Sequence, residues 1–107
     1  MKIRHLFTLA LLGGLAVGRI ASAAGDPAAG KLKAFTCLGC HGIPGYSNAY
    51  PEYRVPKVGG QHAQYIVSAL HEYKAGKRSH ATMRAQASSL SDQDMEDIAA
   101  FFESQGR

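Results

Sequence analysis

The sequence predicts a small all-α domain of three to four helices, and three observations support this fold class. Segments near residues 26–41, 61–74 and 91–105 carry helix-capping residues or apolar side chains at helical spacing. No stretch shows the two-residue alternation that is typical of a β-strand. The segment between the first two helices is long and rich in proline and glycine. Such a loop is uncommon in a compact domain unless it wraps around something.

The chain begins with a stretch that predicts export. A basic start is followed by an apolar run, Leu6 to Gly18, and then by Ala21-Ser22-Ala23, the small-x-small pattern that a signal peptidase requires. An uncleaved membrane anchor is the alternative, but the run is shorter than the roughly 20 apolar residues of a span, and Arg19 interrupts it. We therefore expect a cleaved signal peptide over residues 1–23 and one domain over residues 24–107.

Cleavage would change the charge of the protein. The whole sequence has 12 basic and 8 acidic residues, which gives a formal net charge of +4 at pH 7. Lys2, Arg4 and Arg19 lie in the predicted signal peptide, so the remaining domain carries about +1. This balance gives no support for nucleic acid as a partner. Because a domain of this size has a marginal hydrophobic core, we expect another group to complete it.

The first helix is expected to follow Asp26, an N-cap residue, with Pro27 at its first position, and to continue into the cysteines. Gly30 costs helix stability, so we expect another backbone to approach it closely; a tolerated surface glycine is the alternative. The segment from Gly42 to Gly60 has no steady period and is expected to be loop.

The second helix is expected from Gln61 to Lys74, ending at Gly76, and the apolar face consists of Ile66, Leu70 and Tyr73. The segment KRSHATMRAQASSL that follows is polar, and we expect it to be extended or turning. The last helix should begin after Ser91, which forms a variant of the capping box with Asp94. The side chains of its apolar stripe are Met95, Ile98, Ala99 and Phe102.

The stretch FTCLGCHGIPG contains the only two cysteines, Cys37 and Cys40, and His41 directly follows the second. A zinc site usually has four ligands, often as two separated pairs, and no second cysteine pair exists. A thioredoxin-like dithiol would require a βαβ context, which this sequence does not show. A disulfide at this spacing would close a tiny loop and gain little stability.

Covalent haem attachment is the fourth interpretation, and C-x-x-C-H is its signature. Two thiols at this spacing on a helical turn can each bond one vinyl-derived carbon along an edge of the porphyrin. His41 is then carried under the ring, where its imidazole can bind iron. Export agrees with this interpretation, since such haem is attached outside the cytoplasm. We therefore expect one covalent haem c on Cys37 and Cys40, with His41 as an axial ligand.

The iron needs a sixth ligand, and the domain has two methionines, Met83 and Met95. Met95 belongs to the apolar stripe of the last helix, so packing explains it. Met83 lies in a polar segment without apolar neighbours, which favours a ligand role, and a His/Met pair raises the potential. His80 is the alternative and would give a bis-histidine site of lower potential. His62 and His71 are expected at the surface.

The mature chain resembles the short mono-haem class I c-type cytochromes of bacteria, which are similar to the halves of periplasmic di-haem cytochromes. The resemblance covers Gly25 to about Gln105 and rests on GDPAAGKLKAFTCLGCHG, VPKVGGQHAQYIVSALHEYKAGKR, a lone methionine, and LSDQDMEDIAAFFESQ. It implies the class I cytochrome c fold around one haem, with the first and last helices crossing at Gly30 and at Phe101 or Phe102.

The resemblance also implies roles for individual residues. Cys37 and Cys40 match the thioether cysteines, His41 the proximal ligand and Met83 the distal ligand. Pro56 matches the proline whose carbonyl accepts the other N–H of the proximal imidazole. Two features depart from the common pattern: the loop YSNAYPEYRV is richer in tyrosine, and the segment HATMRAQAS around the methionine is short.

Taken together, these expectations predict a periplasmic one-electron carrier, or the carrier subunit of an oxidoreductase, rather than an enzyme. The alternative that keeps the haem is a small-ligand sensor or peroxidase-like protein with an open or labile distal site. An exported zinc or disulfide module without haem is a weaker alternative. Redox proteins are the expected partners, and no membrane span is expected after signal cleavage. These redox proteins could dock on a basic cluster made of Lys74, Lys77, Arg78 and Arg84. The alternative is that this cluster is an ordinary solvated face.

Overall fold

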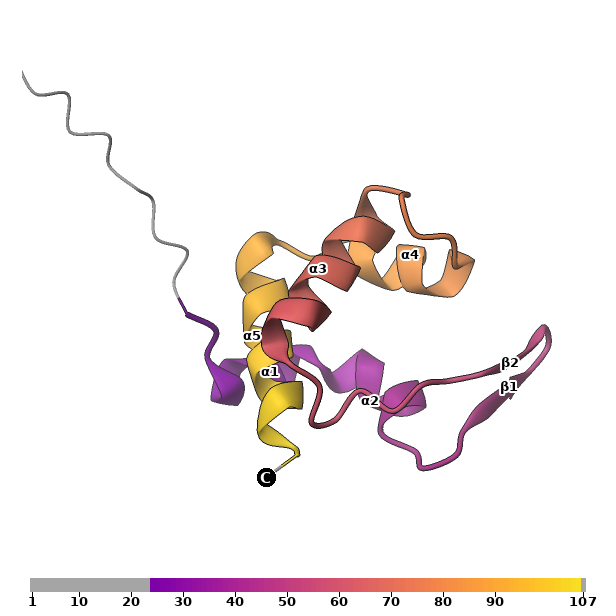
Figure 1. Ribbon diagram of the computed structural model, residues 1–107, viewed down its shortest axis with the longest axis horizontal. Coiled ribbons are helices and arrows are strands. Elements are labelled where there is room, and N and C mark those ends of the chain that lie inside the picture. The colour runs from indigo at the N-terminus through magenta and orange to yellow at the C-terminus, as the bar shows by residue number, and fades with distance from the viewer. Residues whose placement is uncertain (1–23, 107) are drawn as a thin grey trace, which may run out of the picture.

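The computed structural model describes residues 24–106, so the predicted signal peptide lies outside the described residues. This part of the chain forms five helices and one hairpin (Figure 1). Within residues 24–106, no helix has the length and hydrophobicity of a membrane span. The elements are α1 (Pro27–Lys33), α2 (Phe35–His41), β1 (Ser47–Ala49), β2 (Glu52–Arg54), α3 (Ala63–Lys74), α4 (Ala81–Ser88) and α5 (Asp92–Ser104).

The first predicted helix is divided into two. Its start is as expected, because the Asp26 side chain accepts a hydrogen bond from the backbone N–H of Ala28 at 2.9 Å and Pro27 opens α1. At Ala34 the backbone leaves the helical conformation (φ −79°, ψ 4°), and α2 begins with Phe35. Alanine is a strong helix former and Ala34 is fully buried, so packing rather than local propensity places this break.

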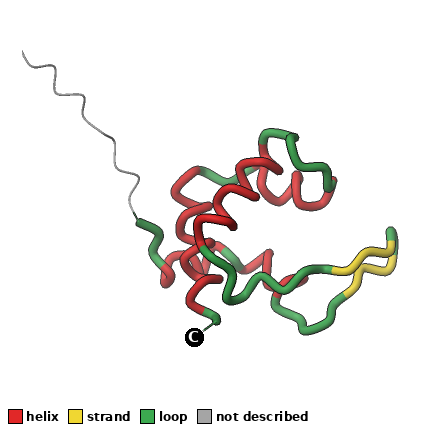
Figure 2. Tube along the Cα trace, viewed as in Figure 1, coloured by secondary structure: helices red, strands yellow, loops and turns green. Residues whose placement is uncertain are grey.

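The long loop contains a short hairpin, which the sequence analysis did not predict. β1 and β2 pair antiparallel, with Ser47 opposite Arg54 and Ala49 opposite Glu52 (Figure 2). Each strand has only three residues, which is too short for a period of two to stand out. The prediction that the segment from Gly42 to Gly60 is loop throughout was therefore wrong at this point.

The segment after α3 also differs from the prediction. α3 ends at Lys74 as expected, and Gly76 follows with a φ of +74°, the left-handed conformation that favours glycine. The polar segment that follows was expected to be extended or turning, but it forms α4 over Ala81–Ser88. His80 is its N-cap residue, and Ala87 is its one buried side chain. A helix with so narrow an apolar face has little amphipathic pattern for sequence reasoning to detect.

α5 matches its prediction closely. Ser91 Oγ accepts a hydrogen bond from the Asp94 N–H at 3.1 Å, and Asp94 Oδ2 accepts one from the Ser91 N–H at 3.0 Å, which completes the capping box. The predicted stripe faces the core, since Met95, Ile98 and Phe102 are each 4% exposed or less. α5 therefore supplies most of the buried surface on which α1 and α3 pack.

The expected crossing of the first and last helices is present (Figure 1). A Cβ atom at Gly30 would lie 1.9 Å from the carbonyl oxygen of Asp97 and 2.9 Å from the Cβ atom of Phe101. No other residue fits there, so Gly30 allows the close backbone approach that was predicted. The buried Asp97 carboxylate fastens the crossing, because it accepts hydrogen bonds from the Asp26 N–H at 2.8 Å and the Lys33 Nζ at 2.6 Å.

Candidate functional site

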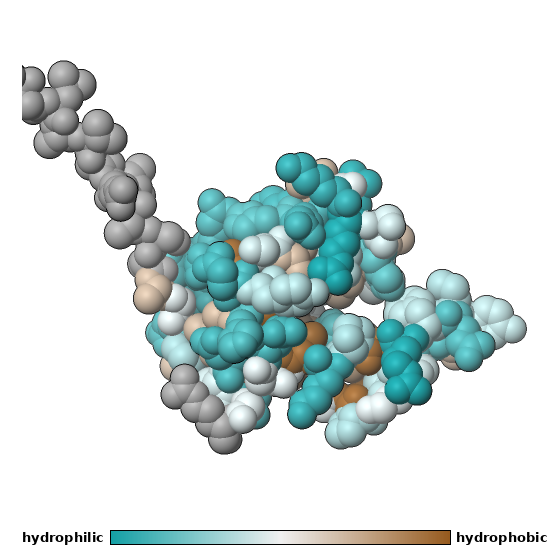
Figure 3. All heavy atoms as spheres, in the orientation of Figure 1, coloured by the Kyte–Doolittle hydropathy of each residue, from teal (hydrophilic) through white to brown (hydrophobic). Residues whose placement is uncertain are grey.

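A cavity of about 330 Å³ lies where the two sides of the molecule face each other. α2 and the segment from Tyr53 to Val58 form one side, and α3 and α4 form the other. Ile98 and Phe102 of α5 also contribute to the lining. Figure 3 shows apolar residues inside this hollow, between surfaces that are mostly hydrophilic. The site is thus an apolar cavity that the helices leave open at one edge of a small core.

α2 carries the C-x-x-C-H residues to the cavity. Cys37 and Cys40 are half-buried and both line the cavity, and burial raises the pKa of the Cys37 thiol. Their spacing places them about one turn apart on the same helix. His41 is the last residue of α2 and also lines the cavity. One short helix therefore presents two thiols and an imidazole to the same space.

The orientation of His41 is set by the chain beyond the hairpin. Its Nδ1 lies 2.7 Å from the carbonyl oxygen of Pro56, and since a carbonyl only accepts, Nδ1 carries the proton and donates. Nε2 then has a free lone pair, which is the form of imidazole that binds a metal. The contact that the resemblance implied for Pro56 is thus present.

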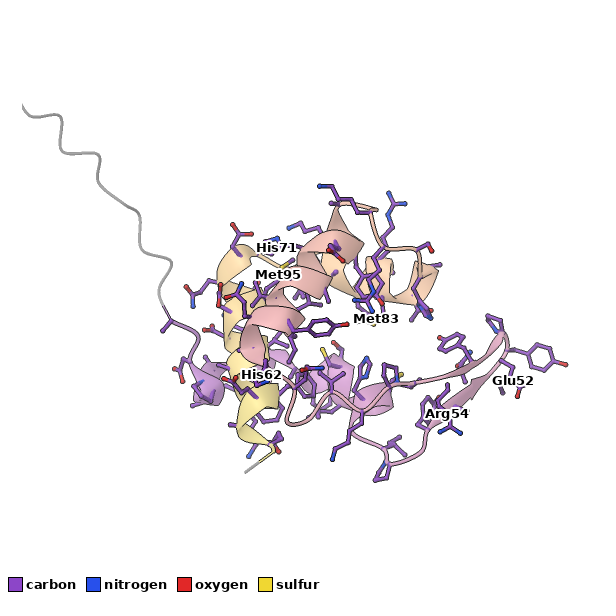
Figure 4. All side chains as sticks on the ribbon, viewed as in Figure 1. Glu52, Arg54, His62, His71, Met83 and Met95 are labelled. Carbon is purple, nitrogen blue, oxygen red and sulfur yellow. The ribbon has the colours of Figure 1, made fainter. Side chains whose placement is uncertain are left out.

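Met83 reaches the cavity from the other side. It is the third residue of α4, is half-buried and packs against the hydrophobic core. In Figure 4 its side chain extends from α4 toward α2, whereas Met95 lies among the packed helices. Met95 is fully buried and does not line the cavity. The expected contrast between the two methionines is present, although Met83 belongs to a helix rather than to a loop.

His80 lies beside Met83 and also lines the cavity. Its Nδ1 accepts a hydrogen bond from the backbone N–H of Met83 at 3.4 Å, so it acts as the N-cap of α4. Its ring meets the Tyr53 ring edge-on, with 4.8 Å between centroids. His62 and His71 lie at the two ends of α3, outside the cavity lining, with exposed side chains, as predicted (Figure 4).

Several polar residues of the lining were not predicted. Tyr53 lies on β2, and its hydroxyl is 3.2 Å from Thr82 Oγ1 on α4. The Arg78 guanidinium lies 5.0 Å from the centre of the Tyr73 ring, and its Nη1 donates to the Tyr65 hydroxyl at 3.4 Å. The tyrosine-rich loop was the signal for Tyr53. Nothing in the local pattern distinguishes Thr82 or Tyr65, because their roles depend on contacts between distant segments.

The four basic residues near α4 differ in how they are engaged. Lys74 Nζ donates to the carbonyl oxygen of Leu90, and Arg78 is held by the two tyrosines. Lys77 and Arg84 are exposed, and neither forms an ion pair within residues 24–106. Part of the cluster therefore has a structural role, and part of it remains open to solvent.

The donor groups around the cavity fit a covalently held haem. Two thiols and an oriented imidazole lie on one side, a thioether lies on the other, and the remaining lining includes apolar side chains of three helices. Thiols can form thioether bonds, and imidazole and thioether groups both bind haem iron. The cavity volume falls in the range of about 300–1,000 Å³ that is usual for cofactor sites.

Comparison with known proteins gives consistent matches. The family model described as cytochrome c matches residues 27–106. Cytochrome c4 of Pseudomonas aeruginosa is 45% identical over 105 residues, covering 98% of this chain and 48% of that protein. Cytochrome c-554(548) of Halomonas halodenitrificans is 45% identical over 85 residues, covering 77% of this chain and 99% of that protein.

A solved structure matches as well. The reduced recombinant cytochrome c4 from Pseudomonas stutzeri superposes with a TM-score of 0.56 at 28% sequence identity, covering 78% of this chain and 51% of that one. The chain thus spans about half the length of the cytochromes c4 that it matches. The all-α class I fold expected from the sequence is confirmed, with the hairpin and α4 as additions.

Proposed function

Since this chain belongs to the cytochrome c family and carries one covalently bound haem c, we propose that it is an exported one-electron carrier with His41 and Met83 as the axial ligands. The observation that carries the proposal is the placement of these two side chains, on α2 and α4, at opposite sides of one cavity. A pair of this kind is the ligation typical of electron-transfer haems.

Different residues around the cavity would bind, orient and shield the haem. Cys37 and Cys40 would hold the haem through thioether bonds, and Pro56 keeps the His41 ring in position through its carbonyl. The apolar lining from α3 and α5 excludes water. When bound, the haem supplies reversible one-electron exchange. The protein supplies ligands, orientation and a dry environment.

Met83 also separates the carrier from a sensor or a peroxidase-like protein. If both axial positions are filled by side chains, no position is open for a small ligand. The packing of Met83 against the core supports a distal side that stays closed. A sensor or peroxidase-like protein would instead need a cavity wall that carries no iron-binding side chain at the position of Met83.

We further propose a periplasmic location and partners that are redox proteins. The basic start, apolar run and small-x-small site of the sequence support export. The exposed Lys77 and Arg84, with Lys74 and Arg78 beside them, could attract an acidic partner to the side of the cavity formed by α3 and α4.

The visible absorption spectrum tests the central proposal. The exported protein is purified from a host able to attach haem, and spectra are recorded in the oxidised form and in the reduced form, with and without carbon monoxide. We expect bands of a low-spin haem that carbon monoxide does not change. A reduced spectrum that shifts with carbon monoxide would contradict a closed distal side, and absence of haem bands would contradict the whole proposal.

A further inference from the structure

The first turn of α4 meets the hairpin across the mouth of the cavity. α4 packs along α3, and its N-terminal end faces the side of the molecule formed by α2 and the hairpin (Figure 1). Tyr53 of β2 spans this gap: its hydroxyl lies 3.2 Å from Thr82 Oγ1, and its ring lies edge-on to His80 at 4.8 Å. The two residues that Tyr53 touches are the N-cap of α4 and its second residue.

We propose that Tyr53 is a positioning residue that keeps the first turn of α4 closed over the cavity and so keeps Met83 on the haem iron. The inference rests on the proposed function, because it assumes that Met83 is the distal ligand. Tyr53 acts on Met83 through His80 and Thr82, the two residues at the start of α4 that it contacts.

The connection from Tyr53 to Met83 is short. Tyr53 packs on the His80 ring, and His80 Nδ1 accepts the backbone N–H of Met83 at 3.4 Å. Loss of the tyrosine ring would free the His80 side chain, and this long cap bond would then have no support. α4 has eight residues and its one buried side chain, Ala87, lies near its C-terminal end, so apart from the partial packing of Met83 its first turn depends on contacts such as this one.

The hairpin is a suitable support for this contact. Tyr53 is paired with Asn48 across the two strands, and Asn48 Nδ2 donates to the carbonyl oxygen of Pro51 at 2.8 Å. The turn is thus braced by a side chain of β1. Tyr53 is half-buried, whereas Tyr50 at the turn is 95% exposed, so only one of these two tyrosines contacts α4.

The ring should matter more than the hydroxyl. A distance of 3.2 Å is long for an O–H···O bond, whose usual length is about 2.7–2.8 Å. Edge-on aromatic contacts stabilise by about as much as an ordinary hydrogen bond, beyond the area they bury. Tyr53→Phe should therefore behave almost as the natural protein does, while Tyr53→Ala should not.

Imidazole added to the ferric protein tests the proposal, because it competes with Met83 for the iron. We expect Tyr53→Ala to bind imidazole about tenfold more tightly than the natural protein, and Tyr53→Phe to stay within about twofold of it. The weak charge-transfer band that marks a methionine sulfur on ferric haem should weaken only in Tyr53→Ala. Tyr50→Ala is the matched control, since it removes an exposed tyrosine of the same hairpin.

The outcomes separate this inference from the proposed function. Equal imidazole affinities for Tyr53→Ala and Tyr50→Ala, with the methionine band intact, would overturn the role of Tyr53. Absence of that band in the natural protein would instead overturn Met83 as a ligand. Should Tyr53→Ala fail to mature with haem, Tyr53→Leu keeps the bulk and removes the aromatic edge. It should raise the affinity several-fold, and an unchanged affinity would refute the proposal.

Discussion

Met83 and Met95 carry the same side chain in different surroundings, so leucine should have different effects at the two positions. Met83 lines the cavity, whereas Met95 is fully buried in the core. Met83→Leu removes the sulfur that we propose as distal ligand, and the reduced protein should then bind carbon monoxide. Met95→Leu nearly conserves volume and should cost less than about 1.5 kcal/mol of unfolding free energy, with the haem spectrum unchanged.

Both variants are assayed by carbon monoxide difference spectra and by chemical unfolding. Each serves as the control for the other, because the substitution is identical and only the position differs. Carbon monoxide binding by Met95→Leu but not by Met83→Leu would reverse the assignment. If neither binds it, another side chain is the distal ligand, and His80 is then the first to test.

Single residues were predictable where their chemistry is local. C-x-x-C-H places Cys37, Cys40 and His41 within one helical turn, so the sequence alone brings them together. The sequence favours Met83 as a ligand because its segment is polar and lacks apolar neighbours, yet Met83 lies in a helix and packs on the core. Tyr53 and Thr82 are 29 residues apart, and only the folded chain brings them into contact.

Elements were predictable where capping and amphipathic pattern agree. α5 has both, and the structure follows the prediction. The N-cap residue of α4 is His80, and histidine is not a usual N-cap residue. In addition, α4 buries only Ala87, so it shows little amphipathic pattern. The hairpin strands are too short to show a period, and the break at Ala34 follows from burial. These elements depend on tertiary contacts that local patterns do not reveal.

The ion pairs at the crossing of α1 and α5 should make the stability of the folded protein sensitive to acid. The Asp26 N–H, the Lys33 ammonium and the Gln93 amide lower the pKa of Asp97 to about 2. Lys33 and the Ser91 N–H lower the pKa of Asp94 to about 2 as well. Because both values lie below the ordinary 3.8, the unfolded chain binds more protons in this range. The stabilisation is complete above about pH 4 and is lost as the pH falls toward 2.

Thermal unfolding of Asp97→Asn, followed by far-ultraviolet circular dichroism between pH 7 and pH 2, checks this acid sensitivity. The variant should be less stable than the natural protein at pH 7, and the difference should shrink as the pH approaches 2. Asp92→Asn is the matched control, because its side chain is 84% exposed at the start of the same helix. A stability difference for Asp97→Asn that stays constant over the whole pH range would contradict the carboxylate's role.

At the scale of the whole molecule, the core is small and incomplete without the haem. The buried side chains come mainly from α3 and α5, and the cavity lies directly beside them. This explains why the composition alone indicated a missing group, while its position could not be inferred before α4 and the hairpin were placed. Basic residues lie around α4, and two acidic residues, Asp92 and Asp94, lie in the first turn of α5.

The exposed basic residues near α4 should steer redox partners by the sign of their charge. Lys77 and Arg84 are exposed members of the basic cluster; Lys77 lies in the connection between α3 and α4, and Arg84 lies on α4. Oxidation of the reduced protein by hexacyanoferrate(III), an anion, should therefore slow as salt is added, since the Debye length is about 10 Å at 0.1 M. Oxidation by the tris(phenanthroline)cobalt(III) cation should not slow in this way.

The double variant Lys77→Gln/Arg84→Gln isolates the contribution of the cluster. At low salt, stopped-flow rates with hexacyanoferrate(III) should fall several-fold and rates with the cobalt complex should rise, because loss of the local positive potential weakens both the attraction of the anion and the repulsion of the cation. At high salt the variant and the natural protein should converge. Lys31→Gln, which removes one exposed charge from α1, should leave both rates nearly unchanged. If Lys31→Gln has the same effect as the double variant, net charge rather than this surface governs the encounter, and the proposed docking face is wrong.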